Sequence, residues 1–241
     1  MASGFSLKRR LHQGHRVIEK EVTDKIMMNL QKDSLSNKIF KMVRDKIVFM
    51  EYPPGMNLSE KDLCKTFKVS RTPLREAIRR LEEMKLVTVI PRYGTYVSQV
   101  EINEIRCAFE VKIKLEGLAG EVAAKRITAD KLKELNTLIE KADVLLKENA
   151  SRNLIEIDTS FHEIIYQSTQ NPILQEILEN LQSRCARLWN SALSESIPVP
   201  EVIAELKEIY LSLKKRDSEK TGRLLENHVR HFIDLIKNQL L

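Results

Sequence analysis

The sequence predicts a mainly α-helical protein in two parts: three helices with a β-hairpin, followed by an all-α bundle of about six helices. Apolar residues recur at helical spacing through most of the 241 residues. Only residues 86–90 and 95–97 form runs rich in β-branched and aromatic residues, and they lie close together as a hairpin would require. Beyond residue 105 no strand pattern occurs, so the second part is expected to be helical throughout.

Composition narrows the class of protein. No apolar run approaches the roughly 18–20 residues that span a bilayer, and the first residues lack the apolar core of a signal peptide. We therefore expect a cytoplasmic protein that binds no membrane. Cys64, Cys107 and Cys185 lie far apart without a CxxC pair, which predicts reduced thiols and argues against a cysteine zinc site.

The basic excess is confined to the N-terminal third. Residues 34–98 hold 13 Lys and Arg against 7 Asp and Glu, and residues 1–33 hold 7 against 4, whereas the remainder holds 20 against 23. This division favours a polyanionic partner for the N-terminal third, although a solvated charged surface would also be basic.

The N-terminal elements follow from apolar spacing and stop signals. Residues 1–33 are predicted to form a basic, partly helical arm. An apolar stripe predicts a first helix over about 35–50, ended by the Pro-Pro-Gly turn that follows. A short second helix, near 59–66, is expected to begin at Ser59, which matches a capping box with Asp62.

Residues 69–87 hold a third helix, amphipathic with a basic outer face. Ser70 and Thr72 are candidate N-terminal caps, and Pro73 fits a first turn. The short turn before this helix predicts a steep crossing with the second helix, as in a helix-turn-helix. Arg71 and Arg75 stand near its start, where a recognition helix meets base edges in the major groove.

A hairpin with Arg92 at its tip follows, so residues 34–98 are predicted to form a winged helix-turn-helix. This stretch resembles the DNA-binding domain of GntR-family transcriptional regulators. The resemblance is carried by the segments LSE at 58–60, VSRTPLREAI at 69–78 and PRYGTYV at 91–97. Lys68 and Lys85 stand where that family usually has glycine, and both fall at predicted turns.

The resemblance implies a homodimer that reads a short palindromic DNA operator. Guanidinium groups match the acceptor pair of guanine, so Arg71 and Arg75 are expected at base edges. Phosphate or base contacts are expected from Ser70 and Thr72, and a phosphate contact from Lys61. The wing tip, formed by residues Arg92, Tyr93 and Gly94, is expected near the minor groove.

After a linker over residues 99–105, residues 106–241 are predicted to form an all-α domain for effector binding and dimerisation. Its helices are expected near 101–126, 129–149, 152–168, 171–194, 200–215 and 217–240. This part resembles the FCD-type effector domain of the FadR-like branch of the same family. The resemblance is carried by residues 109–112, 115–116, 158–162, 171–172 and 227–229.

Asp158 and His162 are four residues apart, so both can face one metal ion from one helix face. His228 on the last helix is the candidate third ligand, with His231 one turn further on. The resemblance implies an Asp and three His as ligands of a divalent metal, but the fourth position is Leu206, which cannot ligate.

Two outcomes follow for the metal. A three-ligand site with open positions would suit zinc, nickel, manganese or iron. Alternatively, the cavity binds its ligand through side chains alone. Lys112 stands where the family often has an arginine that faces the pocket, and it would attract a carboxylate, as would Arg184 or Arg187. The leading hypothesis is therefore a transcriptional regulator that responds to a small organic acid.

Two other functions stay open at this stage. An architectural DNA-binding dimer would use the bundle for dimerisation alone and bind no effector. A metal-dependent hydrolase would use Asp158, His162 and His228. The sequence has no Gly-rich phosphate loop, GxSxG elbow or HExxH motif, so we expect a protein that is not an enzyme.

Overall fold

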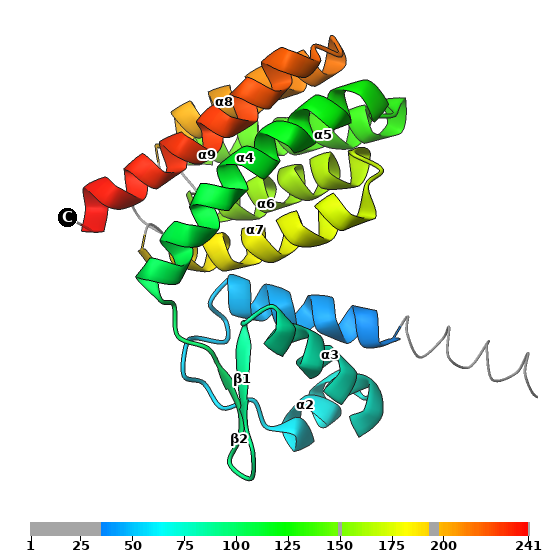
Figure 1. The fold of residues 1–241 in the computed structure, drawn as a ribbon, viewed down its shortest axis with the longest axis vertical. Helices are drawn as coiled ribbons and strands as arrows, with labels where there is room; N and C mark the ends of the chain where they lie inside the picture. The colour runs from blue at the N-terminus through cyan, green and yellow to red at the C-terminus, as the bar shows by residue number, and fades with distance from the viewer. Residues whose placement is uncertain (1–34, 149–150, 193–197, 241) are drawn as a thin grey trace, which may run out of the picture. The chain divides into compact units, whose positions relative to one another are not determined.

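The computed structural model describes residues 35–148, 151–192 and 198–240, and the predicted arm over residues 1–33 lies outside them. The described residues form two compact units. The first contains residues up to Arg44 together with Asn57–Tyr96, and the second contains Asp45–Met56 and the residues from Val97 onward (Figure 1).

The predicted winged helix-turn-helix is present. Residues 35–48 are helical, and they are followed by α2 (Glu60–Phe67), α3 (Arg71–Glu83) and a hairpin of β1 (Val87–Ile90) and β2 (Gly94–Val97). The apolar face of α3 is buried as its spacing predicts. The buried residues of α3 are Pro73, Leu74, Ala77, Ile78 and Leu81.

The helix starts in this unit differ in how they are capped. Ser59 caps α2, because its Oγ accepts from the backbone N–H of Asp62 at 3.3 Å. Ser70 occupies the cap position of α3, but its side chain makes no capping hydrogen bond. Its exposed hydroxyl is therefore not engaged by the helix that it precedes.

The lysines at two predicted turns, Lys68 and Lys85, adopt left-handed backbone. Lys68 has φ +54° and ψ +46° at the end of α2, and Lys85 has φ +57° in the turn before β1. This conformation costs a residue with a Cβ about 1 kcal/mol or more, which glycine avoids. The chain therefore keeps turns that favour glycine and fills them with lysine.

The second unit is the predicted helical bundle, with every helix within about two residues of its expected bounds. Its helices are α4 (Ile102–Arg126), α5 (Ala129–Glu148), α6 (Ser151–Ser168), α7 (Pro172–Ala192), α8 (Val199–Lys214) and α9 (Ser218–Leu240). None of the helices in the described ranges is long and apolar enough to cross a membrane.

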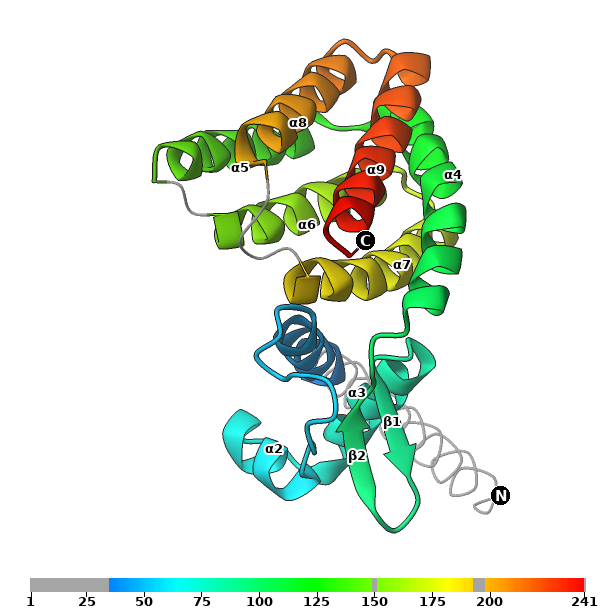
Figure 2. The same cartoon turned by 90° about the vertical axis from the view of Figure 1, so that its left-hand side faces the viewer.

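Helices α4 and α9 run side by side in both views (Figures 1 and 2), and glycine permits their close approach. A Cβ on Gly120 would lie 2.7 Å from Leu225 Cδ1 and 2.9 Å from the carbonyl oxygen of Thr221. A Cβ on Gly222 would lie 2.9 Å from the carbonyl oxygen of Gly117. This packing fixes α9, which carries His228, against α4, which carries Lys112.

Replacing Lys68 by glycine should stabilise the first unit by about 0.5–1 kcal/mol, because the left-handed strain disappears while the unfolded chain gains some freedom. Urea denaturation followed by circular dichroism measures the change. Lys41→Gly, in the interior of the helix over residues 35–48, is the control and should lose about 1 kcal/mol. If Lys68→Gly lowered the free energy of unfolding as Lys41→Gly does, the proposed backbone strain at Lys68 would be contradicted.

Candidate functional site

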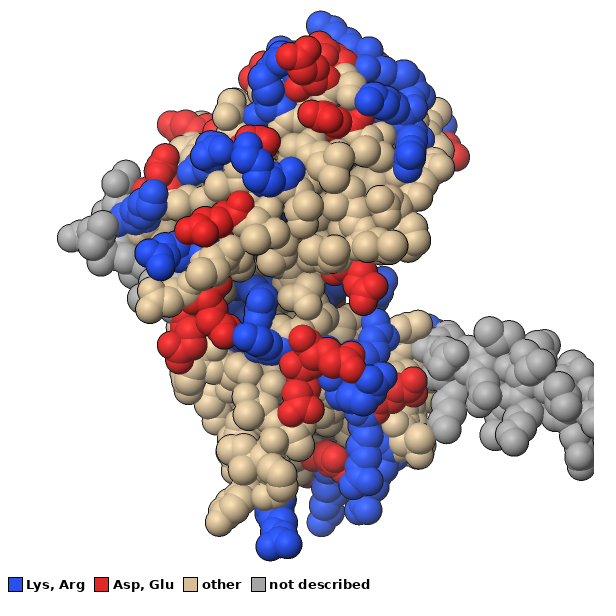
Figure 3. Space-filling view, in the orientation of Figure 1, with Lys and Arg blue, Asp and Glu red and all other residues tan. Residues whose placement is uncertain are grey.

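The residues predicted to contact DNA are all exposed. They are Lys61, Ser70, Arg71, Thr72, Arg75, Arg92, Tyr93 and Gly94. In the space-filling view, Lys and Arg side chains project from the end of the first unit that carries the hairpin tip and α2 (Figure 3). The first unit thus presents one basic surface of the kind that binds a phosphate backbone.

The arginines of α3 fall into two groups. Arg79 pairs with Glu83 one turn along the helix, and Arg80 bonds to the side chain of Asn37 and lies 4.0 Å from the centroid of the Phe40 ring. Both thereby engage a terminal nitrogen of the guanidinium, although Arg79 remains exposed.

Arg71 and Arg75, the two arginines predicted to read bases, are arranged differently. No described side chain pairs with Arg71, and Arg75 turns its Nε toward Glu60, 3.0 and 3.1 Å from the two carboxylate oxygens. This Glu60 partner could not be predicted from local patterns, because the pair lies 15 positions apart and depends on how α2 crosses α3.

The hairpin tip is held by its backbone. Arg92 adopts φ +69° and Gly94 adopts φ +134°, and the N–H of Tyr93 donates to the carbonyl of Ile90 at 3.0 Å. Tyr93 is 77% exposed. A tight turn with a protruding aromatic ring and an adjacent cation suits insertion into a groove of DNA.

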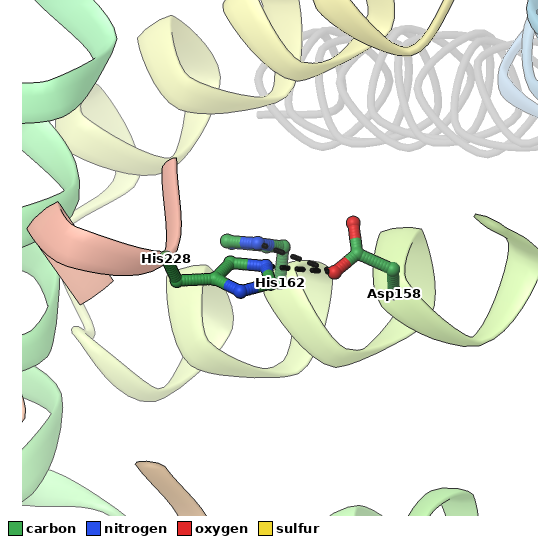
Figure 4. Close-up of side chains that lie close together, drawn as sticks. All are labelled: Asp158, His162 and His228. Carbon is green, nitrogen blue, oxygen red and sulfur yellow. Dashed lines mark hydrogen bonds and ion pairs between the residues drawn. The ribbon is translucent and has the colours of Figure 1, made fainter. Parts of the chain in front are cut away.

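In the second unit, Asp158 and His162 of α6 meet His228 of α9 (Figure 4). Asp158 Oδ1 lies 3.0 Å from His228 Nε2 and 3.8 Å from His162 Nε2. One ligand atom from each residue lies within 4.8 Å of the others, and all three side chains are buried. The three predicted ligands are therefore brought together at a spacing that a single ion could bridge.

Each histidine of the cluster turns its other ring nitrogen to a carboxylate. His162 Nδ1 lies 3.2 Å from Glu116 Oε2, and His228 Nδ1 lies 2.7 Å from Glu205 Oε2. This is the arrangement that orients histidine ligands in metal sites, since a proton on Nδ1 leaves the Nε2 lone pair for the ion. His231 also bonds to Glu205, at 2.6 Å, and lies outside the cluster.

The sequence prediction missed both of these carboxylates. Glu116 lies one helical turn after Lys112, and Glu205 immediately precedes Leu206. Leu206 itself is fully buried in the apolar core, so the predicted fourth ligand position contributes packing and no ligand. The one feature of the sequence that could have indicated Glu205 is that it directly precedes Leu206, the expected fourth ligand position.

The charges of the cluster are coupled. Burial favours neutral Asp158, but His162 and His228 outweigh burial and hold the pKa of Asp158 below its usual value. Burial likewise disfavours a charged imidazole, but the hydrogen bonds with Asp158 and Glu205 outweigh it and raise the pKa of His228 to about 10. At neutral pH His228 therefore carries a proton that a metal ion would displace.

Lys112 is buried and already paired. Its ammonium group bonds to Glu116 and, at 3.1 Å, to the hydroxyl of Tyr166, and only 3% of Lys112 and none of Glu116 is exposed. Burial would favour neutral Glu116, but the charges of His162 and Lys112 outweigh it and lower the pKa of Glu116 well below its usual value. Lys112 thus stabilises a carboxylate of the protein itself.

A cavity of about 30 Å³ adjoins the cluster between α4, α6, α7 and α9, with Lys112 in its wall. Its volume suits a water molecule or an ion and is too small for an organic acid. Trp189 stacks on Phe232 across its wall, with ring centroids 3.4 Å apart and planes at 10°. Burial raises the pKa of Cys185, another wall residue, to about 12, so its thiol stays protonated.

Two residues of the cavity wall each hold a buried polar atom without a hydrogen-bond partner among the described residues: the indole N–H of Trp189 and the hydroxyl of Thr159. Both are buried, so each loses its bond to water without replacement.

Arg187 is buried elsewhere and donates to the carbonyl of Ser98 without lining the cavity. Arg184 lies 3.6 Å from Glu104.

Comparison with protein families decides the identity of both units. The family described as "Bacterial regulatory proteins, gntR family" matches residues 35–97, and the FCD domain family matches residues 107–231. The chain belongs to the GntR family. It is therefore a transcriptional regulator with an FCD domain, and these families, like its relatives, are those of regulators and not of enzymes.

This GntR-family protein is similar to regulators from Escherichia coli K12. The HTH-type transcriptional repressor RspR is 24% identical over 84% of this chain and 89% of its own length. The uncharacterized HTH-type transcriptional regulator YieP is 30% identical over 68% of this chain and 80% of its own length. The solved structure of E. coli McbR/YncC shares the fold, with a TM-score of 0.75 at 24% identity, and covers 86% of this chain and 99% of that one.

Replacing Lys112 by methionine should destabilise the regulator by about 3–5 kcal/mol, because the buried carboxylate of Glu116 loses its cation. Removing both charges, in Lys112→Met with Glu116→Gln, should cost markedly less. Urea denaturation of the two variants and wild type measures this. A double variant no more stable than Lys112→Met would contradict the pairing.

Proposed function

We propose that this regulator binds operator DNA as a homodimer and that a small carboxylate-type effector, together with a divalent metal, modulates this binding. The observation that supports effector control most directly is the buried cluster of Asp158, His162 and His228. Three converging ligand atoms and a carboxylate behind each histidine are costly to bury without a use for them. We place the protein in the cytoplasm, where its DNA target lies.

On the DNA side, we assign base contacts to Arg71 and Arg75. Both are exposed at the start of α3 and have no described partner at their terminal guanidinium nitrogens, whereas Arg79 and Arg80 each engage a terminal nitrogen within the unit. Ser70 has a hydroxyl that α3 does not use, which supports a contact from it to phosphate or base.

The remaining contacts are assigned by position. Thr72 is exposed beside Arg71 for a phosphate or base contact, and Lys61 is exposed in the first turn of α2 for a phosphate contact. Arg92, Tyr93 and Gly94 form the tip that would approach the minor groove.

On the effector side, Asp158, His162 and His228 would hold zinc, nickel, manganese or iron in the 2+ state. These ions accept a mixture of imidazole and carboxylate ligands. The ion would supply a Lewis-acid anchor for a carboxylate oxygen of the effector. Leu206 offers no fourth ligand, which leaves coordination positions for the effector or water.

The cavity sets two requirements for the effector. A molecule larger than water needs side chains of the wall to move, because the present volume is about 30 Å³, and the stacked Trp189 and Phe232 are among the bulkiest of them. The indole N–H of Trp189 and the hydroxyl of Thr159 need partners, which favours an acid with a further oxygen acceptor. Such a ligand changes DNA binding only if it has different affinities for two arrangements of the dimer.

Zinc, added to protein freed of metal with EDTA, should raise the thermal midpoint, because it binds the folded state alone. His228→Ala should abolish the increase. Glu205→Gln should weaken zinc binding by about 10–100-fold while the ligands stay in place. The control is His231→Ala. His231 contacts Glu205 but is not one of the three candidate ligands, so this variant should still bind zinc.

The zinc affinity should also fall as the pH falls below the raised pKa of His228, because the ion competes with the proton on that ring. Isothermal titration at several pH values measures this. Equal affinity for zinc in wild type and His228→Ala would contradict the metal assignment.

A screen of small mono-, di- and hydroxycarboxylic acids against the zinc-loaded protein tests the effector. At least one acid should raise the thermal midpoint further and change affinity for DNA selected by the wild-type protein from a random library. An acid series that changes neither quantity would favour the architectural alternative, in which the bundle serves dimerisation alone.

Arg71→Ala should cost about 1–3 kcal/mol in binding to that selected duplex and little in binding to unrelated DNA of equal length, if Arg71 reads guanine. Arg79→Ala, which removes the same charge from the arginine paired with Glu83, is the matched control. Fluorescence anisotropy at fixed salt measures both. An equal loss on both duplexes would make Arg71 a phosphate contact.

A further inference from the structure

Glu60 is an acidic residue within a surface that is otherwise suited to phosphate. It stands in the first turn of α2, and its carboxylate receives the Nε–H of Arg75 from α3. The oxygens lie 3.1 and 3.0 Å from that nitrogen. A negative charge at this place weakens attraction to any DNA, so its presence requires another reason.

Stability supplies only a small part of that reason, because an acidic residue in the first turn of a helix contributes about 0.3–1 kcal/mol. The side chain of Arg75 is 64% exposed and that of Glu60 is 33% exposed, and exposed ion pairs contribute little to folding. Each helix already buries apolar residues, such as Leu63 of α2 and Leu74 of α3. The ion pair between Glu60 and Arg75 therefore contributes little to the stability of the packing of α2 on α3.

The geometry of the pair suggests a role in recognition. Glu60 engages only the Nε of Arg75, and no described residue bonds to either terminal nitrogen of that guanidinium. The terminal nitrogens form the fork that pairs with O6 and N7 of guanine. A free arginine has considerable rotamer entropy to lose on binding, and a side chain already held in place loses less.

We propose that Glu60 is a positioning residue for operator recognition: it holds the Arg75 guanidinium by its Nε and leaves the two terminal nitrogens to read a guanine. This inference rests on the proposed base contact of Arg75. Glu60 thereby raises discrimination between sequences while lowering attraction to DNA in general. It touches no base itself, and it acts through Arg75.

Glu60→Gln tests the proposal, since it keeps the size of the side chain and removes its charge. Affinities are measured by fluorescence anisotropy for the duplex selected by the wild-type protein and for an unrelated duplex of equal length. The ratio of the two affinities should fall roughly tenfold, with weaker binding to the selected duplex and equal or tighter binding to the unrelated one.

Glu83→Gln is the matched control, because it removes an exposed carboxylate paired with an arginine on the same helix. Its effect should be equal on both duplexes and leave the ratio unchanged. In an Arg75→Ala background, Glu60→Gln should no longer change the ratio. Circular dichroism melts of each variant show whether the unit stays folded.

The results separate failure of this inference from failure of the proposed DNA contacts. Equal tightening on both duplexes by Glu60→Gln, together with a selective loss by Arg75→Ala, would show that Glu60 acts only as a charge, and would overturn the inference. Equal losses on both duplexes by Arg75→Ala would show that Arg75 contacts phosphate, and would overturn the proposed base contact first.

Discussion

The second unit depends on one buried carboxylate, that of Glu116. Burying a charge of this kind costs several kcal/mol unless partners surround it, and here the partners are Lys112, Tyr166 and His162. Their bonds connect α4 to α6 through polar groups within an otherwise apolar core. The orientation of the His162 ring follows from this constraint, so the same interaction that fixes the packing also fixes the candidate metal ligands.

The first unit depends instead on short-range signals, and most of it could be predicted for that reason. The spacing of Leu74, Ala77 and Leu81 predicted the buried face of α3, and Ser59 predicted the start of α2. The predicted turns at Lys68 and Lys85 are present, and both lysines have positive φ there. The apolar pattern and the caps are local properties, and the chain folds as they indicate.

The arrangement around the sites was less predictable. Spacing placed Asp158 and His162 on one helix face, but Glu116 and Glu205 come from other helices, and their contacts depend on packing angles that no local pattern encodes. The pairing of Arg75 with Glu60 is hidden for the same reason. Periodicity marks Lys112 as a candidate cation but cannot show that it is already bound to a carboxylate one turn away.

Trp189 is the sole tryptophan of the chain, and it forms the wall of the cavity in stacked contact with Phe232. All indole emission of the protein therefore originates beside the candidate site. Indole fluorescence would follow any separation of the two rings in wild-type protein without a label that could perturb the site. The tryptophan that lines the candidate site thus also reports on that site to spectroscopy.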